Sequence, residues 1–217
     1  MKKFFLVSVL FLLPSSVFAQ SSYAELSLGA SFPLTVDTKD YTFEDSEDIY
    51  SVHGELDIDG SLIVGAEYGF TGFMEGSWRG GISYEYLKLE LDSAEISGTI
   101  NDVPFSEKVG ASEVRGYGID PDNAVHLVMG NIYYNLPLMA DNFRPYVGVG
   151  AGIASIEHAD TQFALSATAG FRMGINEYSY FGFRYRLYRV EGPTNDFHID
   201  FDPVYANTIS ALIGFYF

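Results

Sequence analysis

The sequence contains no cysteine and few basic residues. Its 217 residues include 12 Lys and Arg against 29 Asp and Glu, for a formal net charge of −17. Without cysteine, disulfide frameworks, thiolate zinc sites and cysteine nucleophiles are excluded. Nucleic-acid binding needs clustered Lys and Arg, so the shortage of basic residues argues against it. Charged residues make up only 19% of the chain, below the roughly 25% of a soluble domain.

Long hydrophobic runs are also missing beyond the start of the chain. Lys2 and Lys3 precede a mostly apolar stretch, 4–13, and Ala19 ends a small-residue pattern typical of a cleavage site. This order predicts a secretory signal peptide over 1–19. No later run approaches the ~18 residues of a membrane helix. We therefore expect an exported chain, 20–217, without membrane helices.

The exported part alternates between apolar residues and polar or small ones with a period of two, as strands with two unlike faces do. Strands of ~9–11 residues suffice to cross a membrane when tilted. The sequence therefore predicts an all-β fold, an eight-stranded antiparallel up-and-down transmembrane β-barrel. Its strands are expected at about 24–32, 58–68, 78–86, 125–136, 147–153, 163–175, 181–187 and 209–217.

Alternation alone does not say which face points inward, because a soluble lipocalin-like barrel has the same period. The polar face decides between them. It consists mainly of Gly, Ser and Ala and contains no lysine, whereas a sheet face in water is richer in charged residues and poorer in glycine. Small residues suit a crowded barrel interior. The apolar and aromatic face is therefore expected to contact lipid.

A few charges of both signs share the inward parity. Buried charges must be paired to be tolerated, so we predict that they form a Glu–Arg network that closes the lumen. The alternative is that the same charges line a narrow, wet pore. The predicted members are Glu25, Glu67, Arg79, Glu85, Arg172, Arg184 and Arg186.

Connections between the predicted strands alternate in length. Short turns and longer loops on opposite sides are typical of outer-membrane barrels, whose long loops face outward. The expected external loops are about 34–57, 92–123, 157–161 and 191–204. Residues 34–60 alone hold nine acids and one base. Such charge blocks usually form a solvated surface.

The acidic loops offer an alternative function, the binding of divalent cations. The residues considered are Asp37, Asp40, Glu44 and Asp45 in one loop and Asp196, Asp200 and Asp202 in another. No segment has the spacing of a calcium loop. We therefore predict neither a metal site nor a cofactor.

Aromatic residues gather at the predicted strand ends, as in the belts at membrane interfaces. One group is Tyr68, Phe70, Phe73, Trp78, Phe143, Tyr146, Tyr178, Tyr180 and Phe181, and the other is Phe32, Tyr84, Tyr86, Tyr188 and Tyr205. Lys88 and Arg189 have lipid-facing parity where two strands leave the membrane. They are candidates for contact with lipopolysaccharide phosphates, the alternative being that they extend into water.

Candidate catalytic sets are weak. Ser51, His53 and Glu55 alternate in one segment, but a triad is recognised by geometry rather than by proximity in sequence. His198 with the nearby aspartates lacks a further well-spaced ligand for a metal. We therefore assign no catalytic residue.

Two adjacent segments, 131–136 and 145–152, resemble the outer-membrane protein beta-barrel family, which includes the membrane domain of outer membrane protein A and the opacity-type small barrels. Gly214, Phe215 and Phe217 resemble the terminal signal that the barrel assembly machinery reads. The resemblance implies a place in the bacterial outer membrane, with outer-membrane lipid, lipopolysaccharide and the assembly machinery as partners.

Because such barrels include adhesins, anchors and small pores, fold alone does not define the function. Our prediction is a monomeric, non-enzymatic barrel with a structural or adhesin-like role, contacting host or envelope proteins through its acidic loops. The alternatives are a small ion or solute pore and, more distantly, a lipid-modifying hydrolase.

Overall fold

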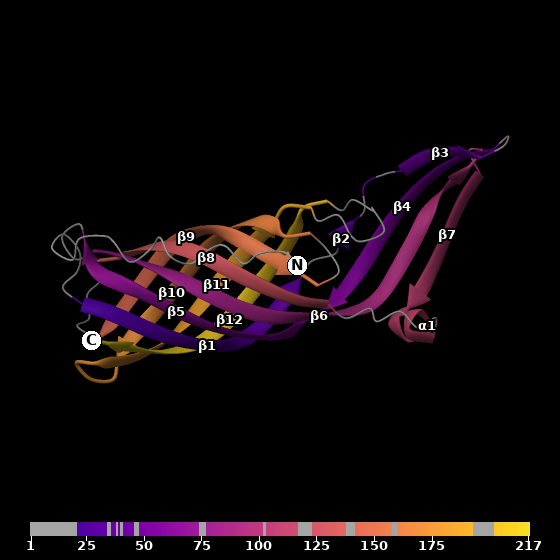
Figure 1. Cartoon of the computed structure of the whole chain (residues 1–217). Helices are drawn as coiled ribbons and strands as arrows, with labels where there is room; N and C mark the ends of the chain where they lie inside the picture. The colour runs from indigo at the N-terminus through magenta and orange to yellow at the C-terminus, as the bar shows by residue number, and fades with distance from the viewer. Residues whose placement is uncertain are drawn as a thin grey trace, which may run out of the picture.

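Eight strands form a closed antiparallel β-barrel in the computed structural model (Figure 1). They are β1 (Ser21–Pro33), β5 (Ser61–Phe73), β6 (Trp78–Ile100), β8 (Asn123–Asn135), β9 (Phe143–Ile156), β10 (Gln162–Gly174), β11 (Ser179–Val190) and β12 (Val204–Tyr216). Each pairs with the next along the chain, and β12 pairs with β1 to close the barrel. The predicted fold is confirmed. The structure describes residues 21–33, 36–37, 39, 41–45, 48–73, 77–101, 103–116, 123–137, 142–157, 160–192 and 202–217.

The two faces of the barrel strands differ as the alternation predicts. On β1, Leu26 is 60% exposed while its neighbour Glu25 is 2% exposed. Val149 of β9 and Ile132 of β8 also point outward. The outer surface of the barrel is thus apolar, and the polar and small residues face the interior.

Three tyrosines that were expected in the aromatic belts lie inside the barrel instead. Tyr146, Tyr180 and Tyr188, expected at the membrane interfaces, are at most 1% exposed and lie inside the barrel. Their parity is that of the inward face, and their hydroxyl-bearing rings fill space there. Strand-end position alone therefore did not distinguish a belt residue from an interior one.

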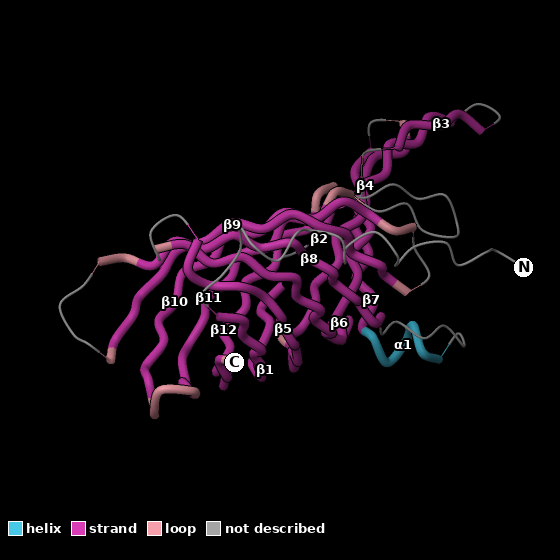
Figure 2. The backbone as a smooth tube through the Cα atoms, turned by 60° about the vertical axis from the view of Figure 1, so that its left-hand side comes forward, coloured by secondary structure: helices cyan, strands magenta, loops and turns pink. Residues whose placement is uncertain are grey.

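One barrel strand continues far beyond the others. Residues Trp78–Leu89 of β6 pair with β8, and residues Glu90–Ile100 pair with β4 (Asp48–Asp59). β7 (Val103–Gly110) pairs with the same distal part of β6, and a short helix, α1 (Ala111–Gly116), follows it. β2 (Val36–Asp37) and β3 (Tyr41–Asp45) pair with β4. We call β2, β3, β4, β7 and the distal part of β6 the sheet extension (Figures 1 and 2).

The sheet extension changes two expectations. The connections 34–57 and 92–123, expected as loops, contain strands, and Ile58 and Asp59 belong to β4 rather than to the second barrel strand. The register between β4 and β6 shifts at Asp57/Ile58, which is an irregularity typical of a β-bulge. Asn101, with a φ of 50°, turns β6 towards β7, and asparagine tolerates this left-handed conformation.

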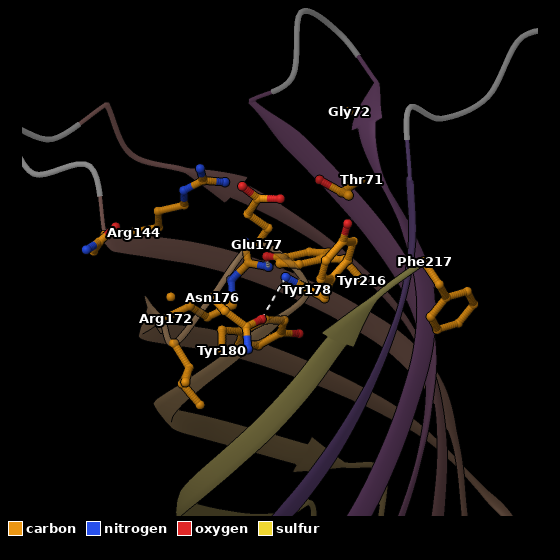
Figure 3. A pocket seen from close by; sticks show the side chains of 13 residues that line it. Thr71, Gly72, Arg144, Arg172, Asn176, Glu177, Tyr178, Tyr180, Tyr216 and Phe217 are labelled. Carbon is orange, nitrogen blue, oxygen red and sulfur yellow. Dashed lines mark hydrogen bonds between the residues drawn. The ribbon is translucent and has the colours of Figure 1, made fainter.

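The sheet extension lies at the end of the barrel away from the C-terminus (Figure 1). At the C-terminal end, strand ends and turns line a cavity of about 750 Å³ (Figure 3). No helix in the described ranges has the length and apolar character to span a membrane.

Candidate functional site

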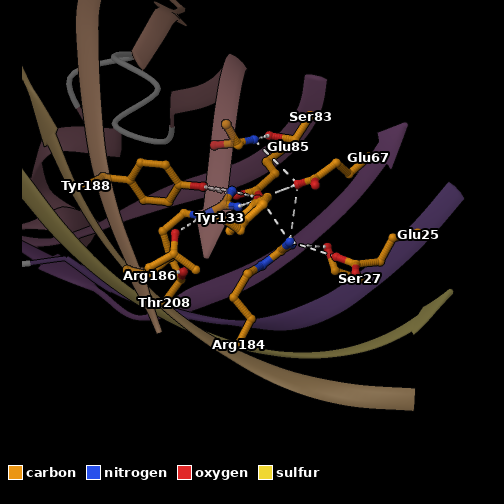
Figure 4. A network of polar contacts seen from close by, with 12 residues as sticks. Glu25, Ser27, Glu67, Ser83, Glu85, Tyr133, Arg184, Arg186, Tyr188 and Thr208 are labelled. Atoms are coloured by element: carbon orange, nitrogen blue, oxygen red, sulfur yellow. Dashed lines mark hydrogen bonds and ion pairs between the residues drawn. The ribbon is translucent and has the colours of Figure 1, made fainter. Parts of the chain in front are cut away.

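Six charged side chains meet inside the barrel, and Figure 4 shows Glu25, Glu67, Glu85, Arg184 and Arg186 among them. Each is at most 4% exposed, and three carboxylates balance three guanidinium groups. They come from four strands: Glu25 of β1, Glu67 of β5, Arg79 and Glu85 of β6, and Arg184 and Arg186 of β11. We call these six residues the lumen cluster. It brings together all but one of the predicted network residues.

Glu85 joins the two arginines of β11. Its Oε1 accepts hydrogen bonds from Arg186 Nη1 at 2.5 Å and from Arg184 Nη2 at 3.2 Å. The Tyr188 hydroxyl donates to its other oxygen, and Arg186 Nε donates to Thr168 Oγ1 at 3.0 Å. Charge-assisted hydrogen bonds of this kind are stronger than neutral ones, so they fix both arginines across the lumen.

Glu67 lies at the centre of the lumen cluster. Its two carboxylate oxygens accept hydrogen bonds from the hydroxyls of Tyr23 at 2.5 Å and Tyr133 at 2.6 Å. Arg184 Nη1 lies 3.6 Å from Glu67 Oε2 and donates to Glu25 Oε1 at 2.8 Å. Hydrogen bonds therefore surround a carboxylate that has no access to water.

Arg79 is held differently, between aromatic rings. Its guanidinium carbon lies 4.0 Å from the ring centre of Tyr133 and 4.4 Å from that of Tyr146. Its Nη1 lies 3.6 Å from Glu25 Oε2, but none of its side-chain nitrogens has a hydrogen-bond partner among the described residues. Cation–π attraction and nearby carboxylates stabilise this fully buried charge.

Arg172, the seventh predicted member, lies apart from the lumen cluster. Its Nη1 donates to the Tyr216 hydroxyl at 2.8 Å and its Nη2 to Asn135 Oδ1 at 2.7 Å. These partners are neutral, and Arg172 lines the cavity at the C-terminal end of the barrel. Parity placed Arg172 on the correct face but could not show its height within the barrel.

Sequence reasoning missed a second layer that fills the lumen. Ten buried residues form an apolar cluster: Ile63, Leu87, Val125, Leu127, Met129, Ala154, Ala164, Tyr188, Val190 and Ala206. We call it the apolar layer. Tyr188 belongs to this layer and also bonds Glu85 of the lumen cluster. The signal in the sequence was the inward run of Val125, Leu127 and Met129, which breaks the expected polar parity.

The predicted surface and assembly residues lie on the barrel wall. Lys88 Nζ lies 3.5 Å from Glu90 Oε1, and Arg189 pairs with Glu191. Phe215 and Phe217 point outward, with exposures of 48% and 66%. Gly214 faces inward, where an added Cβ would meet the Tyr180 ring at 2.1 Å.

The candidate catalytic and metal-binding residues do not come together in a site within the described residues. His53 Nε2 lies 3.9 Å from Asp37 Oδ1 on the sheet extension, where Ser51 and Glu55 share β4 with it. Within the described ranges, no group of three or more His, Asp or Glu residues could hold a metal ion. Asp40, Asp196, His198 and Asp200 lie outside the described residues, and the side chains of Glu44 and Asp45 are likewise not described.

Lys108 and Asp57 connect two strands of the sheet extension. Lys108 Nζ of β7 donates to Asp57 Oδ2 of β4 at 3.0 Å, and Ser93 of β6 donates to the same oxygen at 2.9 Å. The hydrogen bond from Lys108 lowers the pKa of Asp57 below its ordinary value of 3.8, with Ser93 acting in the same direction.

Residues 5–217 match the family model of the outer membrane protein beta-barrel domain. The chain belongs to this family. Among solved structures, Neisserial surface protein A is similar, with 12% identity, a TM-score of 0.53, and coverage of 90% of this chain and 97% of that one. The outer membrane protein OprG from Pseudomonas aeruginosa is also 12% identical, with a TM-score of 0.51 and coverage of 92% and 97%. No curated protein matches in sequence.

Membership of this family places the protein in the bacterial outer membrane. The apolar face of the barrel therefore contacts lipid, as the exposed leucines, valines and isoleucines require. Since short turns of such barrels face the periplasm, we propose that the end with the C-terminus is periplasmic and that the sheet extension is external. At these identities, the two similar structures support the fold alone.

Proposed function

We propose that this barrel is a non-conducting, non-enzymatic anchor that holds an acidic β-sheet outside the cell for contact with a partner protein. The observation that carries the proposal is the 23-residue strand β6, which belongs to the barrel at one end and to the sheet extension at the other. Because the distal part of β6 pairs with β4 on one side and β7 on the other, the sheet extension is held to the barrel more rigidly than flexible loops would be.

The charge of the external segments supports a basic partner. Residues 34–60 hold nine acids and one base, and residues 90–124 hold eight acids and two bases. Complementary charge raises the rate of encounter and favours the matching partner. The partner class that fits is a host or envelope protein with a basic surface.

The contents of the lumen argue against the alternative of a pore. The lumen cluster is neutral and closely hydrogen-bonded, and the apolar layer adds a dry barrier. An ion would have to displace paired charges and then cross apolar side chains, both at high cost in free energy.

Planar-bilayer recordings test this argument. The folded protein should give no discrete current steps, whereas Glu85→Ala, which removes the acceptor of two arginines, should give intermittent ones. Lys88→Ala, on the outer wall, is the matched control and should stay silent. Reproducible steps from the unaltered chain would favour the pore.

A second experiment tests the surface role. Cells displaying the full chain should adhere to a surface coated with a basic protein more than to one coated with an acidic protein. Replacement of 94–109, the hairpin of β6 and β7, by a short turn should reduce the difference while heat-modifiable gel migration shows that the barrel is folded. Equal adhesion of both cell types would contradict the proposal.

A further inference from the structure

Two arginines line the cavity at the periplasmic end of the barrel. They are Arg144 and Arg172, and among the described lining residues Glu177, an exposed residue on the β10–β11 turn, contributes the only carboxylate side chain (Figure 3). The other polar side chains around it are neutral hydroxyls and amides from Thr71, Asn142, Asn176, Tyr178, Tyr180 and Tyr216. At about 750 Å³ the cavity is large enough for a small molecule.

The two arginines are direct neighbours across β9 and β10. Arg144 and Arg172 are register partners of the antiparallel ladder, so both side chains project from the same, inner face. Like charges directly opposite each other destabilise a sheet. Within the part of the chain that the structure describes, neither arginine forms an ion pair with a carboxylate. An anion bound between the two guanidinium groups would offset their repulsion.

Arg172 is the residue built for this role. It is 2% exposed, so its charge is largely removed from water. Its two hydrogen-bonded partners are neutral, and its Nε has no partner within the described ranges. The ring of Tyr180, 5.2 Å from the guanidinium carbon, and that of Tyr146, at 5.6 Å, hold the group in place. A buried cation without a counter-charge is costly unless an anion completes it.

We propose that the periplasmic mouth of the barrel is a binding site for a small anion, a carboxylate or a phosphate, held between Arg144 and Arg172. Arg172 supplies the fixed, desolvated donor, and the exposed Arg144 supplies the second guanidinium from the rim. Planar guanidinium groups suit both kinds of oxyanion. The negative charge of Glu177 repels an anion in the cavity, so it lowers the affinity, and removal of that charge should raise the affinity.

Calorimetric titration of the full mature chain in a non-ionic detergent tests the site, with inorganic phosphate and succinate as probes. Saturable binding of at least one probe is expected. Arg144→Gln should weaken it roughly tenfold, the loss of one charge-assisted contact, and Glu177→Gln should strengthen it. Arg172→Gln should abolish it, with heat-modifiable migration confirming a folded barrel.

Lys108→Gln provides the matched control, because it removes the same charge from the sheet extension at the other end of the molecule. It should leave the affinity unchanged. Binding of phosphate alone or succinate alone would support the site and identify which oxyanion it accepts. Absence of binding by both probes would overturn the proposal, as would equal weakening by Arg144→Gln and Lys108→Gln.

Discussion

Replacing the carboxylate at the centre of the lumen cluster should destabilise the barrel strongly. In Glu67→Gln the side chain keeps its size and loses its charge. The hydroxyls of Tyr23 and Tyr133 then face an amide instead of a carboxylate. Three buried guanidinium groups are left with only Glu25 and Glu85 to balance them.

The magnitude follows from the burial of the remaining charges. Arg79, Arg184 and Arg186 are at most 3% exposed, so water cannot compensate the excess positive charge. Breaking a buried ion pair by removal of one partner costs about 3–5 kcal/mol. We expect Glu67→Gln to lower the free energy of unfolding by about that amount. Glu177→Gln, an exposed change of the same chemistry, should alter it by less than about 0.5 kcal/mol.

Urea unfolding of the protein in lipid vesicles measures this difference. Trp78 is the only tryptophan, and it packs on the outer wall against Tyr134 at a ring distance of 5.0 Å. Its fluorescence therefore reports the transfer of the wall from lipid to water. A second variant, Glu67→Gln with Arg79→Met, restores the balance of charge. It should recover about 1 kcal/mol or more relative to Glu67→Gln alone.

A decrease of less than about 1 kcal/mol in the free energy of unfolding of Glu67→Gln would refute the reasoning, because an unpaired buried charge costs more free energy than that. Such a result would mean that water reaches the lumen cluster, and the pore alternative would gain support. Failure of the double variant to recover stability would show that the cost comes from lost hydrogen bonds rather than from charge.

Two further perturbations test the packing of the wall and the sheet extension. In Gly214→Ala the added methyl meets the buried Tyr180 ring, so we expect a loss of about 1–3 kcal/mol in vesicle unfolding. Gly130→Ala, whose nearest contact is at 3.7 Å, should be neutral. In Lys108→Gln the pKa of Asp57 should rise towards its ordinary 3.8, as measured by carboxyl NMR titration. Because the depressed pKa stabilises the folded state above that pH, this stabilisation should fade on acidification in the unaltered chain and be smaller in Lys108→Gln, where only the hydrogen bond from Ser93 remains.

The barrel could be predicted from the sequence because a membrane barrel offers two strongly different environments. Each residue of a strand faces either lipid or lumen, so a period of two separates Leu26 from Glu25 and Phe183 from Arg184 without any knowledge of the partner strand. The same parity selected all six members of the lumen cluster. It could not predict contacts, because strand tilt and stagger determine the height at which two inward residues meet.

Arg172 and the apolar layer show this limit. Arg172 has the same inward parity as Arg184 and Arg186, yet it lies towards the C-terminal end of the barrel among tyrosines, and no carboxylate of the described residues pairs with it. Met129 and Leu127 have inward parity on β8 and pack with residues from other strands. Their positions depend on register across several strands, which one sequence does not contain.

The sheet extension could not be predicted from the sequence, for a different reason. A strand with water on both sides has no need of apolar alternation, and acidity indicates exposure to solvent rather than absence of regular structure. β7 contains no buried residue, so its apolar burial contributes little to holding it in place. Its order must come mainly from backbone pairing with β6, and β6 is fixed because its first half is part of the barrel wall. We therefore infer that the barrel acts as the template of the external sheet, and that the 94–109 hairpin would not keep its form once separated from the membrane-embedded half of β6.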